Sequence, residues 1–420
     1  MTATDTTAES TEASESTAAE SMGANGSTGA ESTAAESAAA PTADDDRTVR
    51  EIDPTTPAEK GAIPLSVVII TENEADQVED CIESVFAACR GVSAFEVILV
   101  DSASTDRTIE RARRYPVTIL RIPEEHTVSC GAGRFVGDQV ARGELVLHVD
   151  GDMTLTETWL PRAIDYLRNN EDTVGVEGCL DESIQTGVRE VNKIGGVTLY
   201  DAAALAAIGG FDPWLQGYED VDVGFQLTTA GKRLVRLPEV SATHDDDPEI
   251  PEPLRRWRQG YYVAPGQTIR KWLGEPAILR LLLRRQRYKL GLVAWFAAGV
   301  VSLVFTPLLV GWLVFSAIGF AVIASKRGLQ GAVDFLATKT LAIVGVAEGL
   351  TRSPRPASAY PLSAVEVVAA GRVLQGSPLD AEKQPEPTAD ETGSTADTAE
   401  STADETTSVA DTAESATDQD

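Results

Sequence analysis

One acidic pair in this 420-residue sequence stands where it could bind a metal ion. Asp150 and Asp152 are separated by a single glycine and follow the largely apolar run of residues 144–149. Side chains at i and i+2 of a strand share one face, and hard divalent cations take carboxylate oxygens while leaving positions open for substrate phosphates. An Asp-x-Asp pair alone is more often a solvated loop, and a turn at Gly151 could rotate one side chain away. The position directly after an apolar run favours a metal site.

The element before such a pair positions it, and the surrounding sequence alternates between two patterns. Short apolar runs typical of buried strands occupy residues 65–70, 95–100, 117–122 and 144–149. Segments whose apolar residues have helical spacing separate these runs, at residues 75–89, 105–114 and 131–142. Strands and helices in alternation predict an α/β fold with a Rossmann-like, mostly parallel sheet that helices cover on both faces.

Polar residues follow three of the predicted strands. These strand exits are Thr71-Glu-Asn-Glu74, Asp101-Ser-Ala-Ser-Thr-Asp-Arg-Thr108 and Asp150-Gly-Asp152. In open sheets of this kind, ligands bind beyond the carboxyl ends of the strands. One exit could be no more than a helix cap, with Ser104 or Thr105 accepting hydrogen bonds from free backbone amides. Three polar exits together predict a binding site at this edge of the sheet.

The charge of the chain is concentrated at its two ends. The formal net charge is −30, and residues 1–60 and 380–420 together carry 26 acids against 4 bases. Both ends consist mainly of Ala, Ser, Thr, Glu and Asp, and Glu-Ser-Thr-Ala-Ala-Glu-Ser occurs twice near the amino terminus. Such segments hold too little apolar surface to offset chain entropy, so residues 1–60 and 376–420 are predicted to be disordered acidic tails. The alternative is amphipathic helices that fold on a partner.

The segments between the tails differ in the sign of their charge. Residues 61–250 hold 34 acids against 15 bases, whereas residues 251–290 hold 10 bases against 2 acids. A strongly acidic domain is typical of a halophilic cytoplasm, where salt screens dense negative charge, and it argues against nucleic acid as a partner. A high density of basic residues favours an anionic membrane surface, so residues 251–289 are predicted to be a basic juxtamembrane segment.

A predicted membrane segment follows at residues 290–325, which carry no charge. As one straight helix they would measure about 54 Å, against a hydrocarbon core of about 30 Å. Thr306-Pro307 offers a break, which predicts a transmembrane hairpin of two short helices. Basic clusters flank both ends, which predicts that both ends lie in the cytoplasm. A re-entrant or interfacial helix pair is the competing interpretation, and residues 326–375 are expected to form a membrane-proximal helical region.

Five motifs in order resemble the inverting nucleotide-sugar glycosyltransferases of family 2, which have the GT-A fold. The similarity covers roughly residues 64–245. The motifs are Val67-Val-Ile-Ile-Thr-Glu-Asn-Glu74, Val100-Asp-Ser-Ala-Ser-Thr-Asp-Arg-Thr108, Gly131-Ala-Gly-Arg134, Val149-Asp-Gly-Asp152, and Gly209-Gly-Phe-Asp212 followed by Gly217-Tyr-Glu-Asp-Val-Asp222. The resemblance implies that residues 61–250 form a GT-A domain that binds a nucleotide-sugar donor.

The resemblance also implies roles for individual residues. Those that would hold the donor nucleotide are Thr71, Glu72, Asn73, Glu74, Asp101 and Ser104, with Arg134 near the base or phosphates. Asp150 and Asp152 would serve the ribose and a Mg²⁺ or Mn²⁺ ion, and His244 stands where many GT-A proteins place a histidine on the metal. A lone histidine is more often structural, so both interpretations of His244 stay open. Phe135 departs from the small polar residue usual after the arginine, which leaves the contacts to the base open.

Glu219 and Asp220 are similar to the family's acidic pair on the acceptor side. Inversion at an anomeric carbon in one displacement needs a carboxylate that removes the proton from the attacking hydroxyl. The resemblance implies Asp220 as this general base and Glu219 as a group that orients the acceptor, although the two roles could be exchanged. The structural alternative is that both acids only stabilise the amino terminus of a helix.

The predicted membrane segment indicates the class of acceptor. Pro253-Leu-Arg-Arg-Trp257 lacks the glutamine of the Gln-x-x-Arg-Trp motif of processive polysaccharide synthases, which favours transfer of a single sugar. No secretory signal opens the sequence, so the domain is expected at the cytoplasmic face of the cell membrane. The chain resembles haloarchaeal enzymes of protein N-glycosylation, which implies a dolichol-phosphate-linked glycan as acceptor. Two alternatives stay open: a dolichyl-phosphate sugar synthase and a noncatalytic membrane protein that binds nucleotide sugars.

Overall fold

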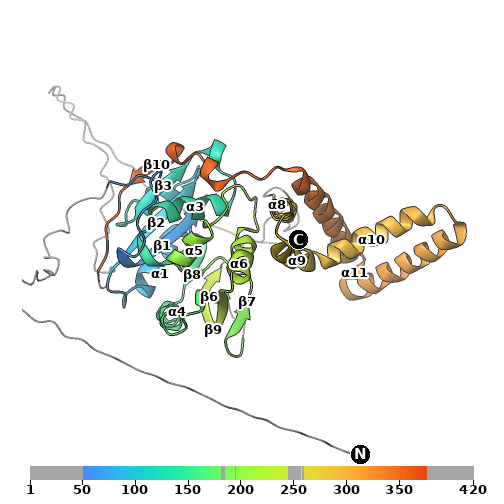
Figure 1. Ribbon diagram of the computed structural model, residues 1–420, viewed down its shortest axis with the longest axis horizontal. Coiled ribbons are helices and arrows are strands. Elements are labelled where there is room, and N and C mark those ends of the chain that lie inside the picture. Colours follow the sequence, from blue (N-terminus) through green and yellow to red (C-terminus); the bar gives the residue numbers. More distant parts are fainter. Residues whose placement is uncertain (1–50, 181–184, 194, 245–256, 258–259, 376–420) are drawn as a thin grey trace, which may run out of the picture. The chain divides into compact units, whose positions relative to one another are not determined.

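The computed structural model describes residues 51–180, 185–193, 195–244, 257 and 260–375 (Figure 1). The predicted acidic tails lie outside the described residues, apart from residues 51–60, and so do residues 251–256 and 258–259 of the predicted basic segment 251–289. The described end of the first tail contacts the domain. Lys60 Nζ donates to Ala141 O at 2.6 Å, and Ala58 N donates to Gln139 O at 2.7 Å. The folded domain therefore begins before residue 61, which is the boundary that composition predicts.

The predicted alternation of strands and helices is present up to residue 150. The strands are β1 (Ile63–Thr71), β2 (Phe95–Ser102), β3 (Thr118–Ile122) and β4 (Gly143–Asp150), and the intervening helices are α1 (Val78–Ala88), α2 (Thr108–Ala112) and α3 (Cys130–Val140). The strands pair in the order β3-β2-β1-β4, and every pair is parallel. Their register aligns Thr71 with Asp101 and Ile70 with Asp150. The three polar strand exits therefore lie at one edge of the sheet.

The rest of the sheet is mixed, which corrects the prediction of a mostly parallel sheet. Its strands are β5 (Met153–Leu155), β6 (Thr173–Leu180), β7 (Arg189–Val191), β8 (Thr198–Asp201), β9 (Arg233–His244) and β10 (Glu366–Ala369). The order is β10-β3-β2-β1-β4-β8-β6-β9-β5, with β7 beside β9. Among these described strands, β6 and β9 pair in parallel, whereas β8 runs antiparallel to both β4 and β6. The link from β6 to β8 contains β7 and no described helix, so it lacks the crossover that a parallel return requires.

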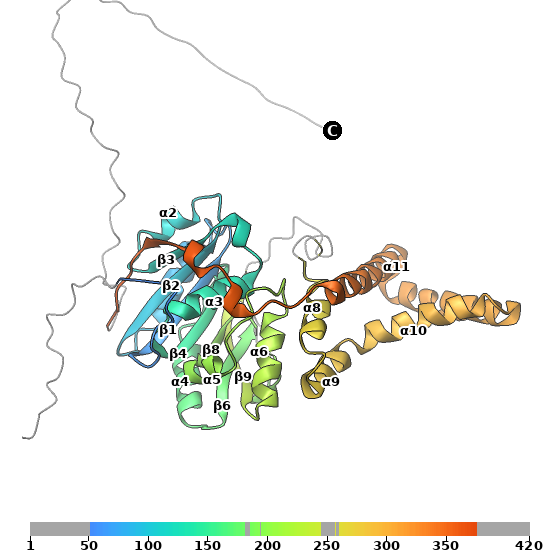
Figure 2. The ribbon, with the colours of Figure 1, turned by 45° about the horizontal axis from the view of Figure 1, so that its top comes forward.

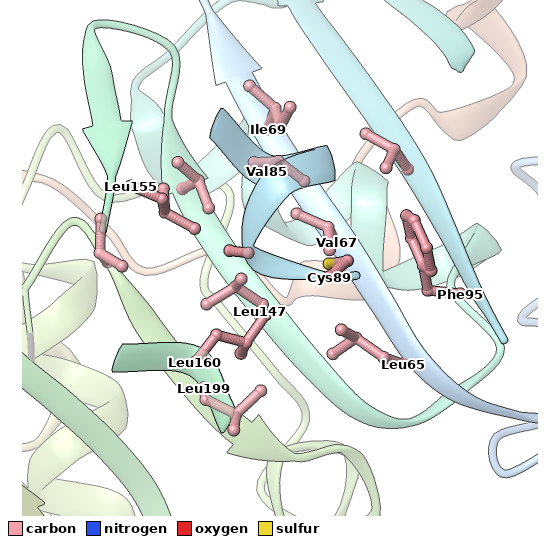
Figure 3. Packing of buried hydrophobic residues seen from close by; sticks show 14 of the residues in the cluster. Leu65, Val67, Ile69, Val85, Cys89, Phe95, Leu147, Leu155, Leu160 and Leu199 are labelled. Carbon is pink, nitrogen blue, oxygen red and sulfur yellow. The ribbon is translucent and has the colours of Figure 1, made fainter. Parts of the chain in front are cut away.

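Helices cover both faces of the sheet. Helix α4 (Trp159–Arg168) joins α1 on one face, and α5 (Ala202–Ala207) and α6 (Glu219–Thr229) join α3 on the other. Figure 3 shows the first of these cores, where Val85 of α1 lies near Val67 and Ile69 of β1. Burying one such side chain contributes about 1.5–3 kcal/mol relative to leaving it exposed. These apolar layers fix the strands whose carboxyl ends carry the polar residues.

A helical segment follows β9. Its described helices are α8 (Ala264–Lys271), α9 (Pro276–Arg285), α10 (Arg287–Ser302) and α11 (Thr306–Thr351). Helices α8 and α9 lie beside α6 (Figures 1 and 2), and the buried side chains between them are Val221, Phe225, Ile269, Ile278 and Leu282. At the end of α8, Lys271 Nζ contacts Asp212 at 2.7 Å and Asp222 at 2.8 Å. Apolar packing and this buried ion cluster together hold α8 and α9 on α6.

Helices α10 and α11 contain the charge-free stretch of residues 290–325. The chain turns between them just before Thr306 (Figure 1). Across the pair, the Trp295 ring stacks on the Trp312 ring, with centroids 5.8 Å apart. Among the described helices, α11 is the one long and apolar enough to cross a membrane. Large apolar side chains on this pair and in the turn between the helices are exposed. The exposed fraction is 89% for Val304 and 70% for Phe315. The exposed surface suits a lipid environment, and the transmembrane hairpin stays a prediction.

The prediction of a helical region over residues 326–375 is wrong for its second half. Helix α11 bends at Gly328, whose φ is +75°, and ends at Thr351. The chain then passes through two 3-10 turns, η2 (Ala357–Ala359) and η3 (Leu362–Ala364), and β10 pairs antiparallel with β3. Figures 1 and 2 show this orange to red segment running from α11 to the β3 edge. Pro354 and Pro356 stop the helix, and the partner strand is too distant in sequence to be recognised.

This returning segment also explains the departure from the family pattern at Phe135. The Phe135 ring meets the ring of Tyr360 edge-on, with centroids 5.8 Å apart. The Tyr360 hydroxyl donates to the carbonyl of His126, in the 3-10 turn η1 (Glu124–His126), at 2.9 Å. The phenylalanine is therefore a packing residue that holds the carboxyl-terminal segment against α3.

Helix α11 approaches α8 so closely that only glycine fits at the contact. A Cβ atom on Gly349 would lie 2.1 Å from the carbonyl oxygen of Val263. We expect Gly349→Ala to lower the free energy of unfolding by about 1–3 kcal/mol, because overpacking pushes the two helices apart. Gly319→Ala in the same helix is the matched control, since no atom lies within 4 Å of its Cβ position. Thermal unfolding followed by tryptophan fluorescence measures both, and equal midpoints would refute this close packing.

Candidate active site

A cavity of about 840 Å³ opens at the carboxyl ends of β1 and β4. The start of α6 forms one side of it, and residues of α9, α10 and α11 form another. The predicted site residues that line it are Thr71, Glu72, Glu74, Arg134, Asp150, Asp152, Glu219, Asp220 and His244. Side chains from the first strand, the fourth strand, α6 and the end of β9 thus meet in one place.

Three predicted site residues, Asn73, Asp101 and Ser104, do not line the cavity. They hydrogen bond to one another instead: Ser104 N donates to Asp101 Oδ1 at 2.9 Å, and Asn73 N donates to Ser104 Oγ at 2.8 Å. Asp101 is fully buried, and this burial raises the pKa of its carboxyl. These contacts tie the exits of β1 and β2 together beside the cavity. Direct nucleotide contacts by the three residues stay a prediction.

Arg134 is the most heavily engaged side chain of the site. Its Nη2 donates to Asp150 Oδ1 at 2.5 Å, and its Nη1 donates to Glu219 Oε1 at 2.7 Å. The arginine side chain is 7% exposed, and its guanidinium lies over the Phe211 ring at 5.7 Å. Burial raises the pKa of Glu219, and the charge of Arg134 works against that rise. Arg134 thus joins the end of β4 to the start of α6.

The glycines beside Arg134 bring α3 close enough to the sheet for this contact. A Cβ atom on Gly137 would lie 2.3 Å from Val68 of β1, and one on Gly133 would lie 2.9 Å from Ile70. At the start of the helix, Ser129 Oγ accepts a hydrogen bond from Gly131 N at 3.2 Å. The Gly131-Ala-Gly-Arg134 motif is therefore a close-packing device that delivers the arginine to the strand ends.

Asp152 and His244 form the predicted metal side of the cavity. His244 Nε2 lies 2.9 Å from Asp152 Oδ2, and Asp152 Oδ1 is buried without a hydrogen-bond partner in the described part of the chain. Burial and then the charge of Asp152 raise the pKa of nearby Glu74 to about 7. Within the described residues, no group of three or more His, Cys, Asp or Glu side chains is close enough to hold a metal ion. By chemical type, the orphaned oxygen with Asp150 and His244 fits a divalent cation.

Glu219 and Asp220 begin α6 and differ in accessibility. Tyr218 before them has a φ of +63°, a left-handed conformation that turns the chain into the helix. The Glu219 side chain is 10% exposed and bound to Arg134, whereas the Asp220 side chain is 25% exposed and accepts from Lys193 Nζ at 3.1 Å. Asp220 is therefore the more accessible acid of the pair.

Sequence analysis did not identify four cations that line the cavity. They are Lys193, from the loop before β8, and Arg285, Lys289 and Lys339, from the helical segment. The last three lie in segments that the sequence predicts to be close to the membrane, and no part in the site was predicted for them. Their approach to the site depends on how α9, α10 and α11 fold back, which local sequence patterns do not encode.

Part of the chain is similar to known glycosyltransferases. Residues 66–191 match the family model described as glycosyl transferase family 2. A dolichol-phosphate mannosyltransferase from Pyrococcus furiosus is 25% identical over 221 residues, which cover 50% of this chain and 61% of the relative. Glycosyltransferase AglE from Haloferax volcanii is 29% identical over 106 residues, which cover 24% of this chain and 35% of the relative. The aligned region thus spans less than two thirds of either relative.

The solved structures that are similar to this chain include a mannosyltransferase. The mannosyltransferase PcManGT from Pyrobaculum calidifontis, in complex with GDP-Man and Mn²⁺, gives a TM-score of 0.48 at 19% sequence identity. That alignment covers 70% of this chain and 90% of PcManGT. The matched residues 66–191 run from within β1 to β7 and include Arg134 of α3 and Asp150 and Asp152 at the end of β4. This part of the chain is therefore similar to the glycosyl transferases of family 2.

Proposed function

We propose that this chain transfers a single sugar, with inversion, from a nucleotide sugar to a lipid-linked acceptor at the membrane. The observation that carries the proposal is that Asp150, Asp152 and the accessible carboxylate of Asp220 line one cavity. A donor site beside a general base is what a single displacement requires. The similarity to family 2 supports this class of reaction. An acid pair that only stabilises a helix would not need its second member open to the cavity.

In this proposal the donor lies at the strand exits. Thr71, Glu72 and Glu74 would contact the nucleotide, and Arg134 would keep Asp150 and Glu219 in fixed positions. Asp150, Asp152 and His244 would hold Mg²⁺ or Mn²⁺, which would supply positive charge to a departing diphosphate. The buried, unpartnered oxygen of Asp152 supports this assignment.

Asp220 would act on the acceptor. Its carboxylate takes the hydroxyl proton as the acceptor oxygen bonds to the anomeric carbon. The bond from that carbon to the diphosphate breaks on the opposite face, and the nucleoside diphosphate leaves with the electron pair. Lys193, 3.1 Å from Asp220, would orient the carboxylate. Glu219 would orient the acceptor and would not take its proton, because its carboxylate already accepts a hydrogen bond from Arg134.

The acceptor we propose is a dolichol-phosphate-linked glycan at the cytoplasmic face of the membrane. The apolar exposure of α10 and α11 supports membrane attachment. The name of the Pyrococcus furiosus relative mentions dolichol phosphate, which supports this lipid class. A second candidate is synthesis of a dolichyl-phosphate sugar, in which the bare lipid phosphate attacks. This second candidate is supported by three cations that line the cavity and could bind a lipid phosphate, namely Arg285, Lys289 and Lys339.

The test is a screen of the membrane-bound full chain in high salt. Each common nucleotide sugar is supplied in labelled form with a dolichol-phosphate-linked lipid extract and Mg²⁺ or Mn²⁺. The expected result is that one donor labels the lipid phase. If no donor labels lipid while a related transferase does so in parallel, the proposed acceptor is wrong or the domain only binds nucleotide sugars.

Transfer is expected to stop when EDTA removes the divalent ion and to return when Mn²⁺ or Mg²⁺ is added in excess. We further expect Asp152→Ala to raise the Mn²⁺ concentration for half-maximal activity about tenfold or more, because one carboxylate ligand is lost. Activity measured across a Mn²⁺ series tests this. Asp172→Ala, outside the cavity, is the matched control. Full activity in EDTA would exclude metal dependence.

A further inference from the structure

Three cations from three helices line the cavity on its membrane side. Arg285 comes from α9, Lys289 from α10 and Lys339 from α11, and we call them the basic wall. In the part of the chain that the structure describes, none of the three forms an ion pair with a carboxylate. Burial, and then the charges of Lys339 and Arg285, lower the pKa of Lys289 to about 8. The three side chains line the same cavity, and no carboxylate among the described residues pairs with them.

The basic wall is held beside the acids of α6. The Arg285 guanidinium lies 5.4 Å from the ring centroid of Tyr218, the residue before Glu219. Gln286 Nε2 donates to the Tyr218 hydroxyl at 3.1 Å. Helix α9, which carries Arg285, also packs on α6 through Ile278 and Leu282. This arrangement holds Arg285 next to the carboxylates that we assign to the acceptor, and Lys289 and Lys339 line the same cavity.

Clustered cations without carboxylate partners are stabilised by an anionic ligand, and phosphate is an anion that several basic side chains bind together. In the proposed function, the donor diphosphate is assigned to the strand exits, beside Asp150 and Asp152. The remaining phosphate in the proposed reaction belongs to the lipid. We propose that Arg285, Lys289 and Lys339 bind the phosphate or diphosphate group through which the acceptor is attached to its lipid. This inference rests on the proposed function and extends it to the acceptor site.

A general attraction to the membrane surface does not account for these residues. Lys326 and Arg327 are also basic and near the predicted membrane segment, but they do not line the cavity. A merely membrane-attracting charge has no reason to lie on the wall that faces the acids of α6. The position of the basic wall therefore indicates a specific phosphate site.

The inference is tested by binding, separately from activity. The full chain in detergent is titrated with labelled farnesyl phosphate, with farnesyl diphosphate, farnesol and inorganic phosphate as competitors. We expect farnesyl diphosphate to compete with the labelled farnesyl phosphate and farnesol to fail, since farnesol lacks the anion. Inorganic phosphate is expected to compete far more weakly, because it lacks the lipid. If inorganic phosphate competes as well as the prenyl phosphates, the site is a free-phosphate site and the lipid assignment is overturned.

Two double variants locate the site. Lys289→Gln with Lys339→Gln is expected to weaken farnesyl phosphate binding about tenfold or more, since two charge-assisted contacts are lost. Lys326→Gln with Arg327→Gln removes the same charge outside the cavity and is expected to bind as the wild type does. Equal weakening in both variants would indicate membrane attraction only, and no weakening in the first would exclude the basic wall.

Donor binding separates this inference from the proposed function. Both double variants are expected to bind nucleotide sugar normally, and a loss of donor affinity in the first would mean that the cations serve the donor diphosphate. If the wild type binds farnesyl phosphate through Lys289 and Lys339 but transfers no sugar from any donor, the basic wall stands and the proposed transfer fails. If transfer occurs with an unchanged KM for the lipid in the first variant, the proposed function stands and the basic wall fails.

Discussion

Replacement of Asp220 by asparagine is expected to lower kcat for transfer to a hydroxyl acceptor by about 10²–10⁴-fold, with unchanged affinity for the nucleotide sugar. Asparagine keeps the shape of the side chain but cannot accept the proton of the attacking hydroxyl. Asp220 is open to the cavity, whereas Glu219 is bound to Arg134. Initial rates of labelled-sugar transfer at saturating donor, together with a donor-binding titration, measure the two quantities separately.

Asp165→Asn is the matched control, because this aspartate is exposed on α4 and lies outside the cavity. An unchanged kcat in Asp220→Asn would exclude Asp220 as the base for the reaction measured. It would be the expected outcome for a bare lipid phosphate as acceptor, since a phosphate oxygen is already ionised at neutral pH and needs no base. Loss of donor binding in Asp220→Asn would instead assign this residue to the donor.

The sequence predicts the parallel half of the fold well because each of its elements is defined locally. The strands are continuous apolar runs, and the helix-containing connections between them are long enough to act as crossovers, so type and direction follow together. The second half is less predictable, because short strands such as β5 and β7 both pair with β9, which lies much later in the sequence. Strand β10 is the extreme case, since its partner β3 precedes the whole helical segment.

The candidate site follows the same division. Asp150 and Asp152 can be placed from the strand that they end, and Arg134 from its glycine motif. The ion pairs of Arg134 could not be predicted, because they depend on the distance between α3 and α6. The basic wall was also beyond local patterns, since residues 285, 289 and 339 meet only after α11 bends back along α8. Sequence patterns identify which groups are present, and the packing of helices decides which of them meet.

Arg134→Met is expected to lower the free energy of unfolding by about 3 kcal/mol, the lower end of the range for breaking a buried ion pair. Methionine replaces the volume of the arginine stem but leaves Asp150 and Glu219 without their cation. The lower end applies because the Asp150 side chain is 26% exposed and keeps some contact with water. Thermal unfolding of the full chain in detergent, followed by tryptophan fluorescence, measures the loss. Arg113→Met is the matched control, because Arg113 is exposed to solvent.

The pH dependence of this loss distinguishes an uncompensated charge from a packing defect. Burial raises the pKa of Glu219, and removing Arg134 takes away the charge that opposes this rise. The folded variant then binds a proton at Glu219 more tightly than the unfolded chain does, so its stability falls as the pH rises above the unfolded value of about 4.3. We therefore expect the deficit of Arg134→Met to be larger at neutral pH than in mild acid. Adding Glu219→Gln should recover part of it at neutral pH, whereas a deficit that is the same at every pH and in the double variant would mean that Arg134 stabilises the fold through its volume alone.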